Sequence, residues 1–256
     1  MWSSSQSATS SITIKDVASG EELFGLGGPV NETAWSLDGG YLATAGAGVV
    51  RIYDLAGNAV WTLPEHVAEA RLRFGPRGLL ATSGRLGSSP EDAIKIWDLR
   101  TQALVATIPS PGSAMAFDRS GALLATDGDA LEIWDIEQGE LVAELPAARA
   151  DVNDLAFSPD GSRLAVASAD GKVRLFDLGS GEEVLVLPVR EGICCALAFS
   201  PDGSMLATRD SDGTVRVWAM DIDDLLEIAR SEVTRSLTDE ECRRYLHLAR
   251  CSTPPP

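Results

Sequence analysis

Two histidines and four cysteines are the side chains of this 256-residue chain best suited to catalysis. His66 or His247 could be the base of a Ser/His/Asp hydrolase, because imidazole exchanges protons near neutral pH. The adjacent thiols of Cys194 and Cys195 could support redox chemistry. The surrounding sequence favours neither activity. It contains no Gly-x-Ser-x-Gly elbow, and Cys194 and Cys195 stand where small apolar residues of a strand are expected, which favours buried packing.

A metal site in the C-terminal region is a second possibility. Cys242, His247 and Cys251 could bind zinc with a fourth ligand, but they lack CxxC spacing. A disulfide between Cys242 and Cys251 is an alternative that a reducing cytosol disfavours. A glycine-rich phosphate loop followed by Lys-Ser or Lys-Thr is also absent from the sequence. We therefore predict no catalytic residue, no metal and no cofactor, and we expect that the protein is not an enzyme.

Aspartates that recur once per repeat form a third candidate set. They are Asp54, Asp98, Asp135 and Asp177, and Ala219 occupies the matching position of the last repeat. Carboxylates can bind cations, but residues that belong to separate repeat units do not converge on one point. Hydrogen bonding within turns explains these residues better.

These aspartates end a block of about forty residues that recurs along the chain. Its copies end in Arg51–Asp54, Lys95–Asp98, Glu132–Asp135, Arg174–Asp177 and Arg216–Ala219, with a shortened copy at Thr13–Asp16. In the copy at 151–188, alternating Val152–Phe157 predicts a half-buried strand. Ser158-Pro159-Asp160-Gly161 and Asp170-Gly171 predict tight turns around the next strand. Each copy therefore predicts four short antiparallel strands.

The repeats resemble the WD40 family in the aromatic residue before the final Asp, the Leu-Ala pairs and the turn glycines. The Leu-Ala pairs are Leu42-Ala43, Leu80-Ala81, Leu124-Ala125, Leu164-Ala165 and Leu206-Ala207. The resemblance covers roughly residues 12–220 and implies an all-β fold. That fold is a WD40-type β-propeller of four-stranded antiparallel blades, about five in number, followed by a short helical tail. The Gly-His pair that the family often places before the first strand has a counterpart only near His66.

The number of blades and the closure of the ring are left open by the sequence. Full repeats are expected near 30–63, 67–108, 112–145 and 151–187, and a repeat with three strands near 192–219. Two further strands are expected near 11–16 and 21–26. Residues 21–26 could complete the fifth blade, but residues 11–16 would then be surplus. We favour an open ring from the C-terminal part of a longer protein, and a small or strained closed ring is the alternative.

We divide the chain into a disordered N-terminal segment (1–10), the β-propeller (11–220), a helical tail (221–250) and a disordered end (251–256). In the tail, Leu225, Leu226, Ile228, Ala229 and Val233 recur with helical spacing. A capping box at 238–241 opens a second helix. We expect the helices to pack on the last blade and cover its open edge.

The tail also carries a resemblance of its own. Leu237-Thr238, Glu241-Cys242 and Tyr245-Leu246 are similar to the C-terminal tails of bacterial WD-repeat signalling proteins. In those proteins the propeller often follows a STAND-type NTPase or a protein kinase. The resemblance implies the same context here.

The formal net charge of −17 disfavours binding to nucleic acid and to anionic membranes. The sequence shows no secretory leader and no apolar run long enough to span a bilayer, so we expect a cytoplasmic protein.

The family resemblance implies a non-catalytic protein–protein interaction scaffold or sensing platform. The alternative is a propeller enzyme or a small-ligand receptor with a site at the central channel. For the scaffold we expect protein partners on the rim of the propeller and no small-molecule substrate. The candidate protein-binding residues are Glu65, His66, Arg149, Asp151, Arg190 and Glu191, together with the inserted loop at 85–93.

Overall fold

The computed structural model describes residues 12–63, 70–84, 93–128, 130–146, 151–188 and 194–220. These residues form short strands that pair in antiparallel sheets. The N-terminal sheet contains β1 (Ile12–Lys15) and β2 (Glu22–Leu26). Blade 1 contains β3 (Glu32–Trp35), β4 (Tyr41–Gly46), β5 (Val49–Asp54) and β6 (Ala59–Thr62). Blade 2 contains β7 (Ala70–Phe74), β8 (Leu79–Gly84), β9 (Ile94–Asp98) and β10 (Ala103–Ile108), with a 3-10 turn at Pro76–Gly78.

The remaining blades follow the same plan. Blade 3 contains β11 (Met115–Phe117), β12 (Leu123–Thr126), β13 (Leu131–Asp135) and β14 (Glu140–Leu145). Blade 4 contains β15 (Val152–Phe157), β16 (Arg163–Ser168), β17 (Lys172–Asp177) and β18 (Glu183–Pro188). Among the described residues, blade 5 contains β19 (Cys194–Phe199), β20 (Met205–Asp210) and β21 (Val215–Ala219).

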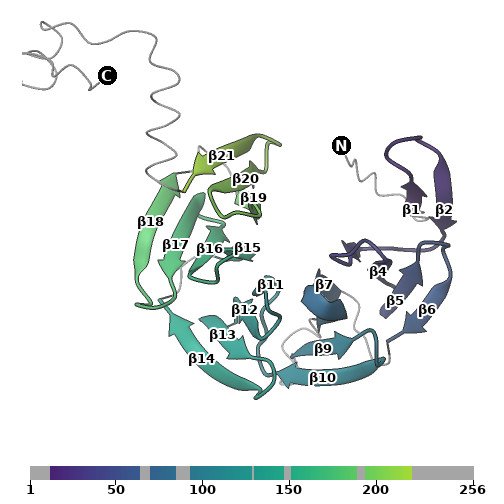
Figure 1. Ribbon diagram of the computed structural model, residues 1–256, viewed down its shortest axis with the longest axis horizontal. Helices are drawn as coiled ribbons and strands as arrows, with labels where there is room; N and C mark the ends of the chain where they lie inside the picture. The colour runs from purple at the N-terminus through teal and green to yellow at the C-terminus, as the bar shows by residue number, and fades with distance from the viewer. Residues whose placement is uncertain are drawn as a thin grey trace, which may run out of the picture.

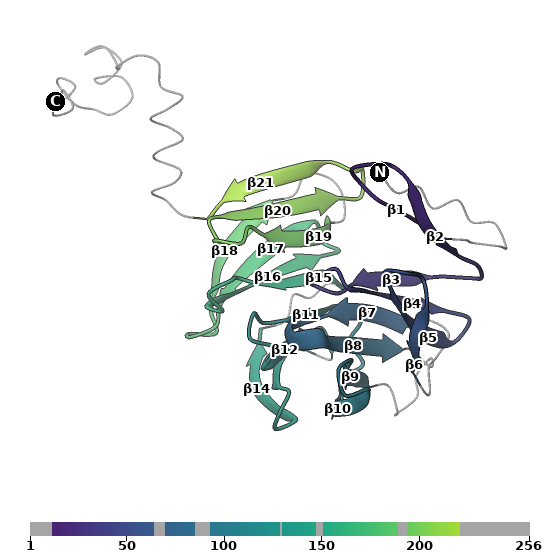
Figure 2. The same cartoon turned by 45° about the vertical axis from the view of Figure 1, so that its right-hand side comes forward.

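The blades stand side by side along an open arc (Figure 1). Strands β10, β14 and β18 lie on its outside, and the first strands of neighbouring blades contact one another on the inside. The N-terminal sheet and blade 5 occupy the two ends of the arc, with a gap between them. Figure 2, the turned view, shows the strands of blades 4 and 5 stacked on one another. The predicted fold class, a WD40-type β-propeller, is confirmed.

The strand content of each repeat is also as the sequence predicts. Four sheets have four strands, blade 5 has three, and the N-terminal sheet has two. Within the described ranges, β2 (residues 22–26) pairs only with β1, so it does not complete blade 5. The arc formed by the described residues is therefore open. The segment predicted to be a helical tail, both termini and residues 85–92 of the inserted loop lie outside the described residues.

Each blade is held to its neighbour by an apolar cluster. In the cluster between blades 1 and 2, Val50 and Ile52 pack with Leu72, Leu80 and Trp97. Equivalent clusters join blades 2 and 3, blades 3 and 4, and blades 4 and 5. A smaller cluster joins the N-terminal sheet to blade 1. Full burial of each such side chain contributes about 1.5–3 kcal/mol, so face-to-face contact between blades is the main source of stability.

The recurring aspartates bond within turns, as predicted. Asp54 accepts from the backbone N–H of Ala56 at 2.9 Å, and Asp135 accepts from that of Gln138 at 2.8 Å. Asp98 and Asp177 accept in the same way from Arg100 and Ser180, both at 2.8 Å. These carboxylates thus close the turn between the third and fourth strands of blades 1 to 4.

Candidate functional site

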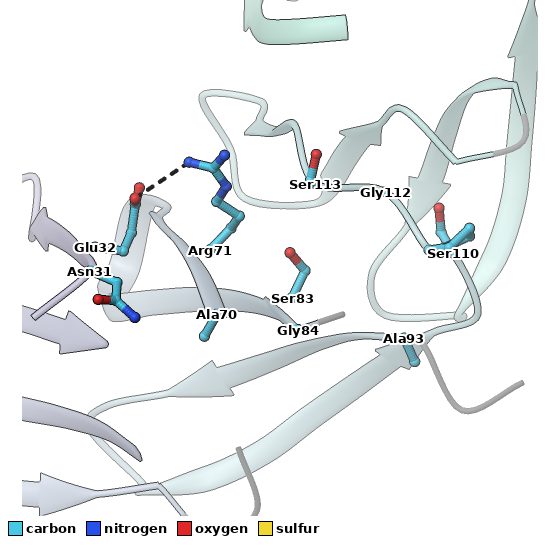
Figure 3. Close-up of a pocket in the computed structure, with 11 residues that line it drawn as sticks. Asn31, Glu32, Ala70, Arg71, Ser83, Gly84, Ala93, Ser110, Gly112 and Ser113 are labelled. Carbon is cyan, nitrogen blue, oxygen red and sulfur yellow. Dashed lines mark hydrogen bonds and ion pairs between the residues drawn. The ribbon is translucent and has the colours of Figure 1, made fainter. Parts of the chain in front are cut away.

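The candidate site is a polar hollow where the innermost strands begin. Glu32 starts β3, Arg71 is the second residue of β7, and Ser113 lies two residues before β11. The hollow has a volume of about 400 Å3, and blades 1, 2 and 3 all contribute to its lining. Ser83 and Ser110 also line it (Figure 3). It therefore offers hydroxyl groups together with charged groups of both signs.

An ion pair between blades lies at the centre of this surface. Arg71 donates from Nη1 to Oε2 of Glu32 at 3.5 Å (Figure 3). The Arg71 side chain is 61% exposed, whereas that of Glu32 is 29% exposed. Burial raises the pKa of Glu32 above its ordinary value, although Arg71 and Arg73 pull it in the opposite direction. A long and exposed pair of this kind contributes little to stability and leaves the guanidinium available to a ligand.

The loop that enters blade 3 is held firmly against the neighbouring strand. Oδ1 of Asp127 accepts from the backbone N–H groups of Ser113 at 2.6 Å and Ala114 at 2.9 Å. A Cβ at Gly112 would lie only 2.1 Å from Oγ1 of Thr126, so this position requires glycine. The Ser113 hydroxyl is therefore presented on a backbone of defined shape.

A second hollow of about 630 Å3 adjoins the first and shares Glu32, Arg71 and Ser113 with it. Both Arg73 and Asp154 line this hollow. Together the two hollows form one continuous polar surface at the mouth of the central channel, which we call the channel-mouth surface.

A hydrogen-bond network at this surface links four blades. Arg73 donates from Nη2 to Oδ1 of Asp154 at 2.5 Å and from Nε to the carbonyl oxygen of Met115 at 2.8 Å. The backbone N–H of Leu197 donates to Oδ2 of Asp154 at 2.8 Å. These residues belong to blades 2, 4, 3 and 5 in turn. The network fixes the spacing of the blades around the channel.

One of the predicted binding residues can be placed. Asp151 is exposed, precedes β15 and lines the second hollow. Its carbonyl oxygen accepts from the backbone N–H of Ala169 at 2.8 Å, which fixes the entry to blade 4. The other predicted residues are Glu65, His66, Arg149, Arg190 and Glu191, and all five lie outside the described residues. The structure therefore brings Asp151 to the channel-mouth surface and leaves the others as predictions.

Sequence reasoning did not select Glu32, Arg71 or Arg73. A signal for two of them was present, because Arg71 and Arg73 alternate with Leu72 and Phe74 in a first strand. Leu72 and Phe74 are both 6% exposed, so the arginines must point to the other face, toward the channel. A pair of alternating cations on an innermost strand indicates a polar channel wall.

The chemistry available here is recognition by charge and hydrogen bonding. Within the described ranges no group of three or more His, Cys, Asp or Glu side chains could hold a metal ion. Both histidines of the sequence are outside those ranges. Among the described residues there is also no helix of the length and apolar character that crossing a membrane requires.

Comparison with known proteins bears on two of the repeats. Residues 139–177 and 181–219 match the family model described as WD domain, G-beta repeat. Each matched segment starts at the outer strand of one blade and ends with the third strand of the next, at Asp177 and Ala219. No curated protein matches the chain. Within a fold that is a WD40-type β-propeller, the chain thus carries two segments that match the WD domain, G-beta repeat family. Together they span the outer strand of blade 3, all four strands of blade 4 and the three described strands of blade 5.

Proposed function

We propose that this protein is a non-catalytic interaction platform that binds a partner protein at the channel-mouth surface. Repeats of the matched family generally mediate protein–protein interaction. The observation that carries the proposal is the Arg71–Glu32 pair, which places an exposed guanidinium and a half-buried carboxylate from two blades beside the hydroxyl of a third. Polar groups supplied by separate blades can recognise a protein segment that crosses them.

The predicted rim residues extend this surface outward. Asp151 supplies an exposed carboxylate at the edge of the second hollow. We include in the proposal the connections that carry Glu65 and His66, Arg149, and Arg190 and Glu191. We propose further that the partner belongs to a cytoplasmic bacterial signalling pathway, which the resemblance of the C-terminal tail supports.

Reversing one charge of the channel-mouth surface tests the proposal. Arg71→Glu should reduce recovery of the partner from the source cell by roughly tenfold or more, as expected for a central interface residue. Arg100→Glu is the matched control, because Arg100 is 71% exposed, pairs with Asp98 at 3.0 Å and lies in a turn of blade 2 after β9. Equal recovery with both variants would contradict the proposed surface.

A small-ligand receptor is the second candidate function. The first hollow, about 400 Å3 in volume, is within the size range of small-molecule sites. A receptor of this kind would be stabilised thermally by a metabolite or a metal, and Arg71→Glu would remove that stabilisation. Such a result, with no protein recovered at stoichiometric levels, would favour the receptor over the interaction platform.

A further inference from the structure

The face of blade 5 that points away from blade 4 is apolar and exposed. By the register of β20 and β21, Ala207 lies opposite Val217, and Met205 lies opposite Ala219. Val215 is two residues from Val217 on the same strand, so it shares their face. Val215 and Val217 are each 61% exposed, and Met205 is 42% exposed. We call these five residues, together with Arg209 opposite Val215, the blade 5 outer face.

The matching positions of every other blade are buried. They are Val50 and Ile52 in blade 1, Ile94 and Ile96 in blade 2, Leu131 and Ile133 in blade 3, and Val173 and Leu175 in blade 4. None of these eight side chains is more than 3% exposed. In blade 4 they are covered by Leu197, Leu206 and Trp218 of blade 5. The sequence of blade 5 thus keeps the apolar pattern of a covered face.

The N-terminal sheet does not supply the missing cover. Its apolar residues Ile12, Ile14, Phe24 and Leu26 already pack on blade 1. Its opposite face carries Thr13 and Lys15 together with Leu23, and both Lys15 and Leu23 are exposed. A face with these polar side chains is a poor match for a row of valines.

We propose that the C-terminal segment 221–233 folds back over the blade 5 outer face and buries it. The path of the chain supports this occupant. The backbone N–H of Met220 donates to the carbonyl oxygen of Ser204 at 2.7 Å, so residue 220 is anchored at the end of β21. The segment that follows therefore starts next to Ala219, at the edge of the exposed face.

The length and pattern of the segment also fit. Leu225, Leu226, Ala229 and Val233 recur at helical spacing and form one apolar stripe. A helix over residues 224–233 is about 15 Å long at 1.5 Å per residue. The five residues of β21 span about 17 Å at 3.4 Å per residue. One helix of this length covers the strand from end to end.

Charge complementarity favours the same arrangement. Arg209 is an exposed cation on an otherwise apolar face. The segment supplies Asp221, Asp223, Asp224 and Glu227 around its first turn. Carboxylates at this end of a helix also interact favourably with its dipole. The segment starts beside Ala219, whereas Arg209 lies opposite Val215 at the other end of β21. Glu232 near the end of the segment is therefore the carboxylate placed to pair with Arg209.

The test compares two valines of similar exposure in the full-length chain. Val217 is 61% exposed, and Val142 on outer strand β14 is 58% exposed. Val217→Asp should lower the melting temperature and accelerate amide hydrogen exchange in 222–233 by roughly tenfold or more, because a buried charge opens the contact. Val142→Asp should change neither. Equal effects of the two variants, or no exchange protection in 222–233 of the unaltered protein, would overturn the proposal.

A second variant leaves the propeller sequence unchanged. Leu226→Asp combined with Val233→Asp should accelerate exchange at the amides of β21 and raise binding of a hydrophobic dye, as an uncovered apolar face does. Glu240→Gln combined with Glu241→Gln is the control, because both residues are polar and lie outside the segment 221–233, and it should show neither change. If instead a second copy covers this face, sedimentation will show a concentration-dependent dimer that Val217→Asp converts to monomer. That outcome would also overturn the proposal.

Discussion

Blades 4 and 5 are built from the same repeat but differ in what covers them. Leu164 and Leu206 occupy one position of the second strand and are both fully buried. On the other face of the third strand, Val173 is fully buried against blade 5, whereas Val215, beyond which the described residues place no blade, is 61% exposed. The repeat pattern therefore specifies four strands and a turn, and the neighbouring blade determines how much of that pattern is buried.

The other end of the arc shows the same effect. Tyr53 occupies the aromatic position of the third strand that Phe176, 1% exposed, occupies in blade 4. The sheet that covers Tyr53, however, has two strands in place of four. Tyr53 is accordingly half-buried. In a molecule whose apolar clusters each join two adjacent units, the end units gain the least stability from packing. The central blades are thus expected to be the stable part of the propeller.

The largest effect is expected from truncating an aromatic ring in a central blade. Phe176→Ala should lower the free energy of unfolding by about 3–5 kcal/mol, because it removes a buried ring and leaves a cavity. Tyr53→Ala should lower it by less, because solvent already reaches this ring. Denaturant unfolding of both variants measures the difference. Equal losses would show that cover by the neighbouring blade does not set the stability of a repeat.

The next largest effect is expected at the junction of blades 4 and 5. Asp154→Ala removes the acceptor of Arg73 and leaves the backbone N–H of Leu197 without this partner. The free energy of unfolding should fall by about 1.5–3 kcal/mol, as for hydrogen bonds to charged groups. Hydrogen exchange should show that β19 is affected more than β3, since the carboxylate binds blade 5 directly. Uniform acceleration of exchange across the chain would argue that Asp154 does not act at this junction.

Most of the fold could be predicted from the sequence, because the same pattern of residues recurs in every repeat. Alternating residues, the Leu-Ala pairs and the turn glycines gave the strands of every sheet to within a few residues. Closure could not be predicted, because it depends on how far successive blades rotate about the axis. The failure of residues 22–26 to pair with blade 5 is a property of the whole arc.

The candidate site was less accessible to sequence reasoning. Glu32 and Arg71 are thirty-nine positions apart in the chain and meet only because β3 and β7 are adjacent innermost strands. The connections between blades, where propellers often bind their partners, indicate Asp151. Charged residues inside the strands, such as Arg71, are not part of these connections.

Acidification should lower the stability of blade 4 and of blade 5 in the same way. The Ser158 hydroxyl donates to Asp160, and with Ser162 it lowers the pKa of this carboxyl from 3.8 to about 2. In blade 5, Ser200 lowers the pKa of Asp202 in the matching turn. A carboxylate with a lowered pKa in the folded state stabilises the protein above its unfolded pKa. That stability is lost as the pH falls from about 4 to about 2.

Asp160→Asn and Asp202→Asn test this expectation one blade at a time. Each variant should flatten the fall in melting temperature between pH 4 and pH 2 by a small and similar amount, because both turns are exposed and neither depends on a neighbouring blade. A larger change for Asp160→Asn would mean that the covered blade also strengthens its turn.

The smallest effect on stability, and the opposite dependence on pH, is expected at the channel mouth. Burial raises the pKa of Glu32, so the folded state holds this proton more tightly than the unfolded chain does. Its contribution to stability is present below the unfolded pKa and is lost as the pH rises through the folded pKa. Glu32→Gln removes this dependence together with a long ion pair, which is worth about 0–1 kcal/mol. At neutral pH the free energy of unfolding should therefore change by no more than about 1 kcal/mol. A loss as large as that of Asp154→Ala would show that the Arg71–Glu32 pair supports the blades, and would remove the reason to regard it as free for a partner.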